Sequence, residues 1–334
     1  MTTRLRTLAT NRLLLLGGLL AIVFMGVSLA HPGYASAQNI RDLLVQCAPV
    51  VIIGCAMTLV ILAGEIDVSV GSMMGLLAAG IGILSSPERL GLPAGVVVAV
   101  VVAGGILLGC VNGMLVVAGR VPSIIVTLGM MTVLRGVTEI LMGGEWITDL
   151  PASVRYLGTG EPLGLPLSIW TAMAAVVATV VVARKTPLGL HIYATGGNTA
   201  AAAMARVHVG VVRVTVFAIA GLMTAVATLV SVPQQSVIES GIGVGFELLV
   251  ITAVVVGGTS ISGGYGGVAG TVLAALLLAN IRPALLYLDL GDRATFWERA
   301  IQGAFILAAV LSDRCRWFRR ADGKAVTITT GGSP

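Results

Sequence analysis

Two carboxylates lie within a long apolar stretch of this chain. Glu65 and Asp67 belong to the sequence TLVILAGEIDVSVGSMMGLLAAG, residues 58–80, and Ser69 and Ser72 follow closely. A charge at the centre of a bilayer costs at least about 2.5–3.5 kcal/mol, so such groups tend to face a cavity or a partner. The density of glycine and serine predicts a helix that is broken or very closely packed. The segment therefore lines a polar passage or, alternatively, lies at a membrane–water boundary where two helices meet.

Other polar side chains in apolar surroundings extend this set. Arg135 and Glu139 are four residues apart, one helical turn, and share a helix face. In one interpretation they neutralise each other and are simply tolerated as an intramembrane pair. In the other they line a polar passage, where the Arg135 guanidinium would offer five hydrogen-bond donors. His31, His191 and His208 fall at predicted loops or membrane edges without paired carboxylates. We therefore expect no catalytic residues.

The sequence GGTSISGG at 257–264 invites comparison with a phosphate-binding loop. Such a loop requires a lysine after its second anchoring glycine. That position is Gly264, and the lysines of the chain are Lys185 and Lys324. The segment therefore encodes no nucleotide site, and its glycines favour a short helix, a turn and a second helix at membrane depth.

Composition identifies the elements that position these residues. The 334 residues are 57% hydrophobic and 10% charged, against about 25% charged in soluble domains. Long unbroken apolar runs, in place of alternation, argue against a transmembrane β-barrel and indicate an all-α, polytopic membrane bundle. The four cysteines have no metal-binding or disulfide spacing. The basic residues cluster by membrane side, which explains the net charge better than nucleic-acid binding does.

The apolar segments predict about ten transmembrane helices. They fall near 13–30, 48–64, 70–84, 94–118, 122–142, 166–183, 211–231, 247–257, 266–281 and 296–312. The apolar run after Leu13 is longer than the core of a secretory signal, so we expect an uncleaved first helix. The chain then divides into a cytoplasmic segment 1–12, a single transmembrane domain 13–312 and a basic, disordered tail 313–334.

The distribution of basic residues predicts the orientation. With both termini in the cytoplasm, thirteen Lys and Arg residues fall in inner segments and five in outer ones, as the positive-inside rule requires. The inner set is Arg4, Arg6, Arg12, Arg120, Arg184, Lys185, Arg206, Arg213, Arg314, Arg316, Arg319, Arg320 and Lys324; the outer set is Arg41, Arg89, Arg155, Arg282 and Arg293. Five spans on each side of the 143–165 loop would make two halves of odd span number, which would be inverted relative to each other if they are repeats.

Small residues recur at every fourth position in two helices. Gly105, Gly109 and Gly113 form one set, and the other is Gly266, Gly270 and Ala274. This spacing places them on one helix face and predicts close contact between helices.

The inner loop at 184–213 contains a helix of its own. Asn198 is suited to cap it, and TAAAAMARV at 199–207 is rich in strong helix formers. A short amphipathic helix between spans either docks into a groove of a partner protein or lies on the lipid surface.

Four motifs in order resemble the sugar-type permeases of bacterial ATP-binding-cassette (ABC) importers, the ribose, xylose, arabinose, rhamnose and autoinducer-2 group. They are EIDVSVGS at 65–72, GRVPSIIVTLGMMTVLRG at 119–136, TPLGLHIYATGGNTAAAAMA at 186–205 and FELLVITAVVVGGTSISGGYGGVAGT at 246–271. IDVSVGS, with GEWITDLP at 144–151, looks closest to the rhamnose and autoinducer-2 subgroup.

The resemblance implies a multi-pass inner-membrane permease without a cofactor of its own. It implies a second permease subunit, a periplasmic solute-binding protein, and ATPase subunits that bind ATP and Mg²⁺. It also implies that the coupling helix seated in the ATPase includes Gly197, Asn198, Thr199, Ala201, Ala202 and Met204. Ala200, Ala203 and Arg206 stand where the family pattern has Glu, Arg and Gly, which puts the usual polar contacts to the ATPase in doubt.

The functional hypothesis is therefore half of a translocation path for a small sugar or sugar-like solute of the rhamnose, autoinducer-2 or ribose class. Polar groups in otherwise apolar helices would line it: Asp67, Ser69, Ser72, Thr127, Arg135, Thr259 and Ser260. The first alternative is a proton-coupled secondary transporter with Glu65 or Asp67 as the relay. The second is a membrane scaffold or an intramembrane enzyme.

Overall fold

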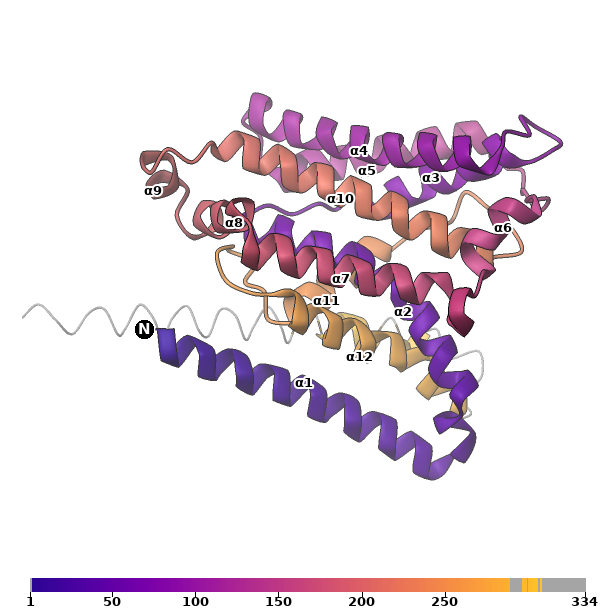
Figure 1. Ribbon diagram of the computed structural model, residues 1–334, viewed down its shortest axis with the longest axis horizontal. Coiled ribbons are helices and arrows are strands. Elements are labelled where there is room, and N and C mark those ends of the chain that lie inside the picture. The colour runs from indigo at the N-terminus through magenta and orange to yellow at the C-terminus, as the bar shows by residue number, and fades with distance from the viewer. Residues whose placement is uncertain (1, 289–295, 299, 306, 308–334) are drawn as a thin grey trace, which may run out of the picture.

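The computed structural model describes residues 2–288, 296–298, 300–305 and 307, and the side chains from residue 13 onward. Its described residues form a bundle of roughly aligned helices (Figure 1). The elements are α1 (Thr2–Ala30), η1 (Pro32–Ala35), α2 (Ala37–Leu62), α3 (Val70–Ser85), α4 (Ala94–Gly119), α5 (Ser123–Met142), α6 (Ala152–Thr159), η2 (Pro162–Gly164), α7 (Leu167–Lys185), α8 (Pro187–Gly197), α9 (Thr199–Met204), α10 (Val209–Ser231), η3 (Val232–Gln234), α11 (Phe246–Val256) and α12 (Val268–Tyr287). The prediction of an all-α fold is confirmed for these residues.

Seven of these helices, α1, α2, α4, α5, α7, α10 and α12, are long and apolar enough to cross a membrane. The 16-residue α3 and the 11-residue α11 are shorter. At about 1.5 Å per residue neither spans a hydrocarbon core of about 30 Å. These nine helices match nine of the ten predicted segments. The tenth, 296–312, is described only at 296–298, 300–305 and 307, and the tail 313–334 lies outside the described residues. The predicted total of about ten spans therefore stays a prediction.

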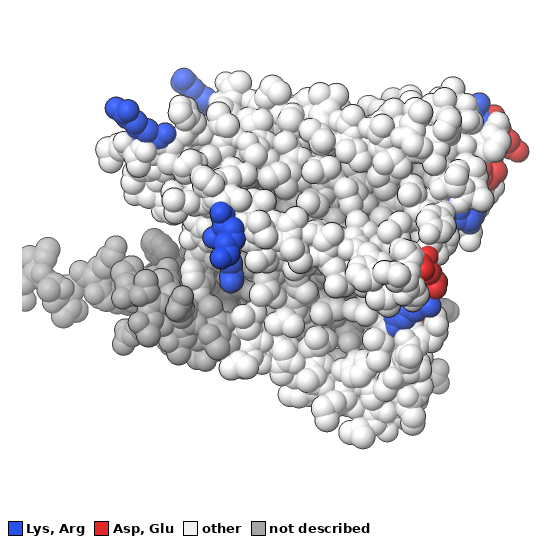
Figure 2. All heavy atoms as spheres, viewed as in Figure 1, with Lys and Arg blue, Asp and Glu red and all other residues white. Residues whose placement is uncertain are grey.

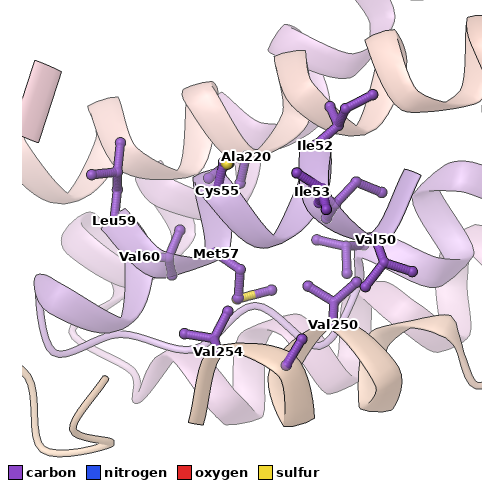
Figure 3. Packing of buried hydrophobic residues seen from close by; sticks show 14 of the residues in the cluster. Val50, Ile52, Ile53, Cys55, Met57, Leu59, Val60, Ala220, Val250 and Val254 are labelled. Atoms are coloured by element: carbon purple, nitrogen blue, oxygen red, sulfur yellow. The ribbon is translucent and has the colours of Figure 1, made fainter. Parts of the chain in front are cut away.

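Helix α2 lies at the centre of the bundle. In its membrane-span window 83% of the residues are buried, because α7, α10, α11 and α12 pack around it. Figure 3 shows its branched and sulfur-containing side chains between Ala220 of α10 and the pair Val250 and Val254 of α11. Close approach elsewhere depends on glycine: a Cβ at Gly109 of α4 would lie 2.2 Å from the carbonyl oxygen of Phe217 on α10. The predicted packing role of the 105–113 glycines is thus confirmed.

The bundle has two distinct ends. The end that carries α8 and α9 is on the left in Figure 1 and is called the α8 end; the opposite, α6 end carries the 143–165 and 232–246 loops. An antiparallel bridge between Ile147 and Ile238 joins those two loops. The Ser86 hydroxyl, at the end of α3, donates to Asp149 at 2.6 Å, and this hydrogen bond lowers the pKa of the Asp149 carboxyl.

Charges differ between the two ends. Figure 2 shows Lys and Arg without acidic residues at the α8 end of the visible face, and both signs together at the α6 end. Two ion pairs lie at the α6 end, Arg41–Glu161 and Arg89–Glu145. This asymmetry is the pattern that the positive-inside rule associates with a cytoplasmic α8 end.

Candidate functional site

The carboxylates at Glu65 and Asp67 lie in a break between two helices. Helix α2 ends at Leu62 near the α8 end, and α3 begins at Val70 inside the bundle. Between them, residues 65–68 form no helix or strand. Gly64, with φ +84°, allows the turn that sends the chain back into the bundle. The expectation of a broken helix is confirmed.

Segment 65–68 lies outside any helix, so its backbone N–H groups need acceptors from other parts of the chain; only that of Glu65 still donates to α2, at the carbonyl oxygen of Val60. Helix α5 supplies two of them. The N–H of Ile66 donates to the Ser123 hydroxyl and that of Val68 to the Thr127 hydroxyl, each at 3.1 Å. Ser123 and Thr127 are one turn apart, so the segment runs along the first turn of α5.

Asp67 is completely buried and stabilises the start of α3. One of its carboxylate oxygens accepts from the backbone N–H of Ser69 at 2.9 Å and from the Ser69 hydroxyl at 2.7 Å. The amide of Asn112, on α4, donates to the Ser69 hydroxyl at 2.8 Å and to the second Asp67 oxygen at 3.5 Å. Asp67 thus acts as a local cap that α4 completes.

Glu65 is neutralised by a residue from the second half of the chain. One of its carboxylate oxygens lies 2.6 Å from the Nε of Arg213, near the start of α10. The Glu65 side chain is 7% exposed and the Arg213 side chain 30%. A paired carboxylate in this position ties the broken segment to α10.

Arg135 does not form a pair with Glu139 among the described contacts. Its guanidinium donates to the carbonyl oxygens of Ser240 and Ile242, at 2.8 and 3.1 Å, while Glu139 is exposed on α5. Arg135 therefore fastens the 232–246 loop to the bundle.

Two short helices meet through their N-termini inside the bundle. The loop before α11 re-enters from the α6 end, just as the segment before α3 re-enters from the α8 end. A Cβ at Gly71 of α3 would lie 2.4 Å from the carbonyl oxygen of Gly243 and 2.0 Å from a carboxylate oxygen of Glu247. The two helices then run to opposite ends, an inverted arrangement of the kind that places substrate sites at half-helix N-termini in transporters.

Thr259 and Ser260 lie elsewhere, in the loop at the α8 end that joins α11 to α12. The backbone N–H of Ser260 donates to the carbonyl oxygen of Tyr265 at 2.8 Å. The Thr259 hydroxyl is buried and has no hydrogen-bond partner among the described residues. The structure thus brings Asp67, Ser69 and Thr127 together around segment 65–69. The guanidinium of Arg135, from α5, lies beside Gly75, farther along α3. Thr259 and Ser260 are separate from both groups.

Most of the predicted path residues are buried within this chain. Those at 2% exposure or less are Asp67, Ser69, Ser72, Thr127 and Thr259. Arg135 and Ser260 are half-buried. Residues that the sequence did not single out take part as well: Asn112, Ser123, Arg213 and Glu247. Asn112 could have been found by the same criterion as Asp67, a polar side chain in an apolar span.

The loop at 184–213 forms two short helices where we expected one. Helix α8 is additional, and its start is capped by the Thr186 hydroxyl, which accepts from the backbone N–H of Gly189. The predicted cap is confirmed: the Asn198 side chain accepts from the backbone N–H of Ala201 at 3.0 Å. Helix α9 ends at Met204 rather than at residue 207. Met204 is 83% exposed, whereas Ala202 faces the bundle at 4%.

Comparison with known proteins places the chain among transport permeases. Residues 39–310 match the family described as "Branched-chain amino acid transport system / permease component". The chain is 38% identical to the ribose import permease protein of Haemophilus influenzae, over 88% of this chain and 90% of the relative. It is 34% identical to the ribose import permease protein of Escherichia coli K12, over 88% of this chain and 91% of the relative. It is also 34% identical to the autoinducer 2 import system permease protein LsrC of Yersinia pseudotuberculosis, over 88% of this chain and 83% of the relative. No solved structure matches.

Proposed function

Because the chain belongs to the permease family described as "Branched-chain amino acid transport system / permease component", we propose that it forms half of the translocation path for a small sugar or sugar-like solute. Family membership and the ribose and autoinducer-2 relatives identify it as a permease subunit of a sugar-type ABC importer. With seven helices among its described residues that are long and apolar enough to cross a membrane, it is a multi-pass protein of the inner membrane.

The path runs where α3 and α11 meet. Half-helix N-termini supply unbonded backbone N–H groups and a partial positive charge, and hydroxyl-rich solutes bind to such donors. The surrounding groups are Asp67, Ser69, Ser72, Thr127 and Arg135, with Thr259 and Ser260 nearer the α8 end. Five of these seven are buried, so a solute reaches them only when the segment 63–69 moves relative to α5. This arrangement of two broken helices is the observation that carries the proposal.

Energy comes from partner subunits. ATP and Mg²⁺ bind to an ATPase at the α8 end, a second permease completes the path, and a periplasmic binding protein delivers solute at the α6 end. The ATPase contacts the exposed residues of the α8–α9 connection, among them Gly197, Asn198, Thr199, Ala201 and Met204, while the buried Ala202 anchors α9. Both termini lie in the cytoplasm, and the complete chain has about ten spans.

The class of solute is a small polyhydroxylated molecule, with ribose, rhamnose and autoinducer-2 as the candidates. Ribose and autoinducer-2 are named by the relatives. The IDVSVGS and GEWITDLP motifs resemble the rhamnose and autoinducer-2 subgroup.

Uptake into proteoliposomes tests the proposal. The permease is reconstituted with its ATPase and binding protein, and uptake of the three labelled solutes is measured with ATP, without ATP and with an uncoupler. We expect uptake that needs ATP and both partners and is insensitive to the uncoupler. The proposal would be contradicted by full solute uptake with the permease alone, or by loss of uptake when an uncoupler is added at constant ATP.

A further inference from the structure

Three segments approach one another at the α8 end closely enough for backbone atoms to touch. The last turn of α8 provides Gly196 and Gly197, the turn after α2 provides Gly64, and the loop between α11 and α12 provides Gly263 and Gly264. We call these five residues the glycine junction. A Cβ at Gly196 would lie 1.9 Å from the carbonyl oxygen of Leu62, a distance that no side chain can occupy.

The loop between α11 and α12 touches both other segments. A Cβ at Gly263 would lie 2.9 Å from the Cα of Gly64 and 3.0 Å from that of Gly196, and a Cβ at Gly264 would lie 2.6 Å from the Cα of Gly197. The backbone N–H of Gly264 donates to the carbonyl oxygen of Leu62 at 2.9 Å. The end of α2 and this loop are therefore joined directly, with α8 against both.

At three of these positions the backbone has a conformation that only glycine adopts without strain. Gly64, Gly263 and Gly264 have φ values of +84°, +82° and +71°. L-residues with a Cβ are strained in this region. The junction thus lacks flexible side chains that could absorb a displacement of α8 by changing rotamer.

A further contact links α8 to the same loop. The Tyr193 hydroxyl donates to the carbonyl oxygen of Gly266 at 3.0 Å. Burial raises the pKa of Tyr193, so the phenol remains a donor at neutral pH.

We propose that the glycine junction transmits movement of α9 to both broken segments at once, which makes Gly196 and Gly264 positioning residues for transport. One recipient, segment 63–69, leads to the N-terminus of α3. The other, 257–267, follows the C-terminus of α11. Displacing α8 shifts both short helices, and their N-termini meet at Gly71 and Gly243. The inference rests on the proposed docking of an ATPase at α9.

Alanine substitutions test it in the complete importer in nanodiscs. Gly196→Ala forces α8 away from Leu62, and Gly264→Ala combines a clash with a strained φ. We expect the ATPase still to co-purify and to hydrolyse ATP, while solute transported per ATP falls about tenfold, within the range typical of allosteric coupling. Gly95→Ala in α4, where a Cβ meets nothing within 4 Å, is the matched control and keeps the wild-type ratio.

A second measurement does not depend on the variants folding. Hydrogen exchange of wild-type importer is compared before and after trapping the ATPase in its ATP-bound state. We expect segments 63–69 and 257–267 to change exchange together with 187–204. The inference would be overturned if the change in hydrogen exchange were confined to 187–204. It would also be overturned if a folded Gly196→Ala importer transported as much solute per ATP as the wild type. Either result would leave the proposed function intact. If crosslinkers at Met204 never capture the ATPase in an active importer, the docking proposal fails and the inference with it.

Discussion

Glu65 and Arg213 are unequally buried, and this difference predicts unequal effects of removing either one. Arg213→Gln leaves a carboxylate with 7% exposure and no partner, whereas Glu65→Gln leaves a guanidinium that is 30% exposed and can reach water. Breaking a buried pair costs about 3–5 kcal/mol when a charge is left uncompensated. We expect Arg213→Gln to lower the melting temperature clearly more than Glu65→Gln, and the double variant to recover part of the loss. Thermal unfolding in detergent measures this; equal losses would show that Glu65 is solvated.

Asp67 is expected to work as a hydrogen-bond acceptor rather than as a proton carrier. In Asp67→Asn one oxygen still accepts from Ser69, and the new amide can donate to the Asn112 oxygen, which has no partner among the described residues. Asp67→Ala removes the acceptor of both Ser69 hydrogen bonds, at about 1 kcal/mol for each bond. We therefore expect near-normal ATP-driven uptake and stability in Asp67→Asn and a lower melting temperature in Asp67→Ala. Loss of uptake in a stable Asp67→Asn would instead support the proton-relay alternative.

The sequence predicted which residues are unusual better than it predicted their partners. Asp67, Thr127 and Arg135 stand out because polar groups are costly in apolar spans. Their contacts join positions far apart in the chain, such as Arg135 with Ser240. Local spacing offered Glu139 as one of two alternatives for Arg135, whereas the guanidinium contacts two carbonyl oxygens on a distant loop. Such choices depend on the tertiary arrangement, which periodicity does not encode.

At the scale of elements, helix boundaries followed hydrogen bonding rather than hydropathy. The apolar segment 48–64 predicted only the inner part of α2, which begins at Ala37. The first turns contain Gln38, Asn39 and Arg41, which are polar but compatible with a helix, and the Ser36 hydroxyl caps them. Hydropathy reports membrane burial, so it misses the part of a helix that extends beyond the apolar core.

The contact between α4 and α10 predicts a sharp contrast between glycines. A Cβ at Gly109 would lie 2.2 Å from the Phe217 carbonyl oxygen, whereas a Cβ at Gly129 of α5 meets nothing within 4 Å. Gly109→Ala should separate the helices and destabilise the protein by about 1–3 kcal/mol, as overpacking does. Gly129→Ala should be neutral or slightly stabilising, because alanine favours helix. The melting temperatures of the two variants, measured in the same detergent, test this contrast. A Gly109→Ala variant as stable as the wild type would mean that α4 and α10 have room to move apart.

The cap of α9 allows the coupling proposal to be tested without changing exposed contacts elsewhere. Asn198→Ala removes the acceptor for the Ala201 N–H, at about 1 kcal/mol. In a six-residue helix that loss is enough to fray the element. We expect weaker ATPase co-purification and slower uptake in Asn198→Ala, with both restored in Asn198→Asp, which keeps the acceptor. An equal loss in Asn198→Ala and Asn198→Asp would show that the ATPase needs the Asn198 amide itself rather than the helix cap.

On the scale of the whole molecule, α2 and α10 stand in similar surroundings in the two halves of the chain. The described helices α2 and α10 are each followed by a re-entrant segment and a short helix, and these short helices run in opposite directions. Five spans in each half would give opposite directions of this kind if the halves were repeats, and that relation stays a prediction. That α3 and α11 would touch at Gly71 and Gly243 was not predictable, because the contact joins residues 172 positions apart in the sequence.

The orientation of the bundle decides whether α9 can reach an ATPase, and cysteine labelling measures it. Lys185→Cys places a thiol at the end of α7 beside α8, and Glu145→Cys places one in the loop after α5, at the opposite end. Cys47 and Cys55 are buried and should react slowly, while Cys110 and Cys315 are replaced by serine in the background. With a cytoplasmic α8 end, a membrane-impermeant maleimide should label Glu145→Cys in intact spheroplasts and Lys185→Cys only after permeabilisation. The reverse result would turn the basic end outward, against the positive-inside rule. Helix α9 would then be out of reach of any ATP-hydrolysing partner.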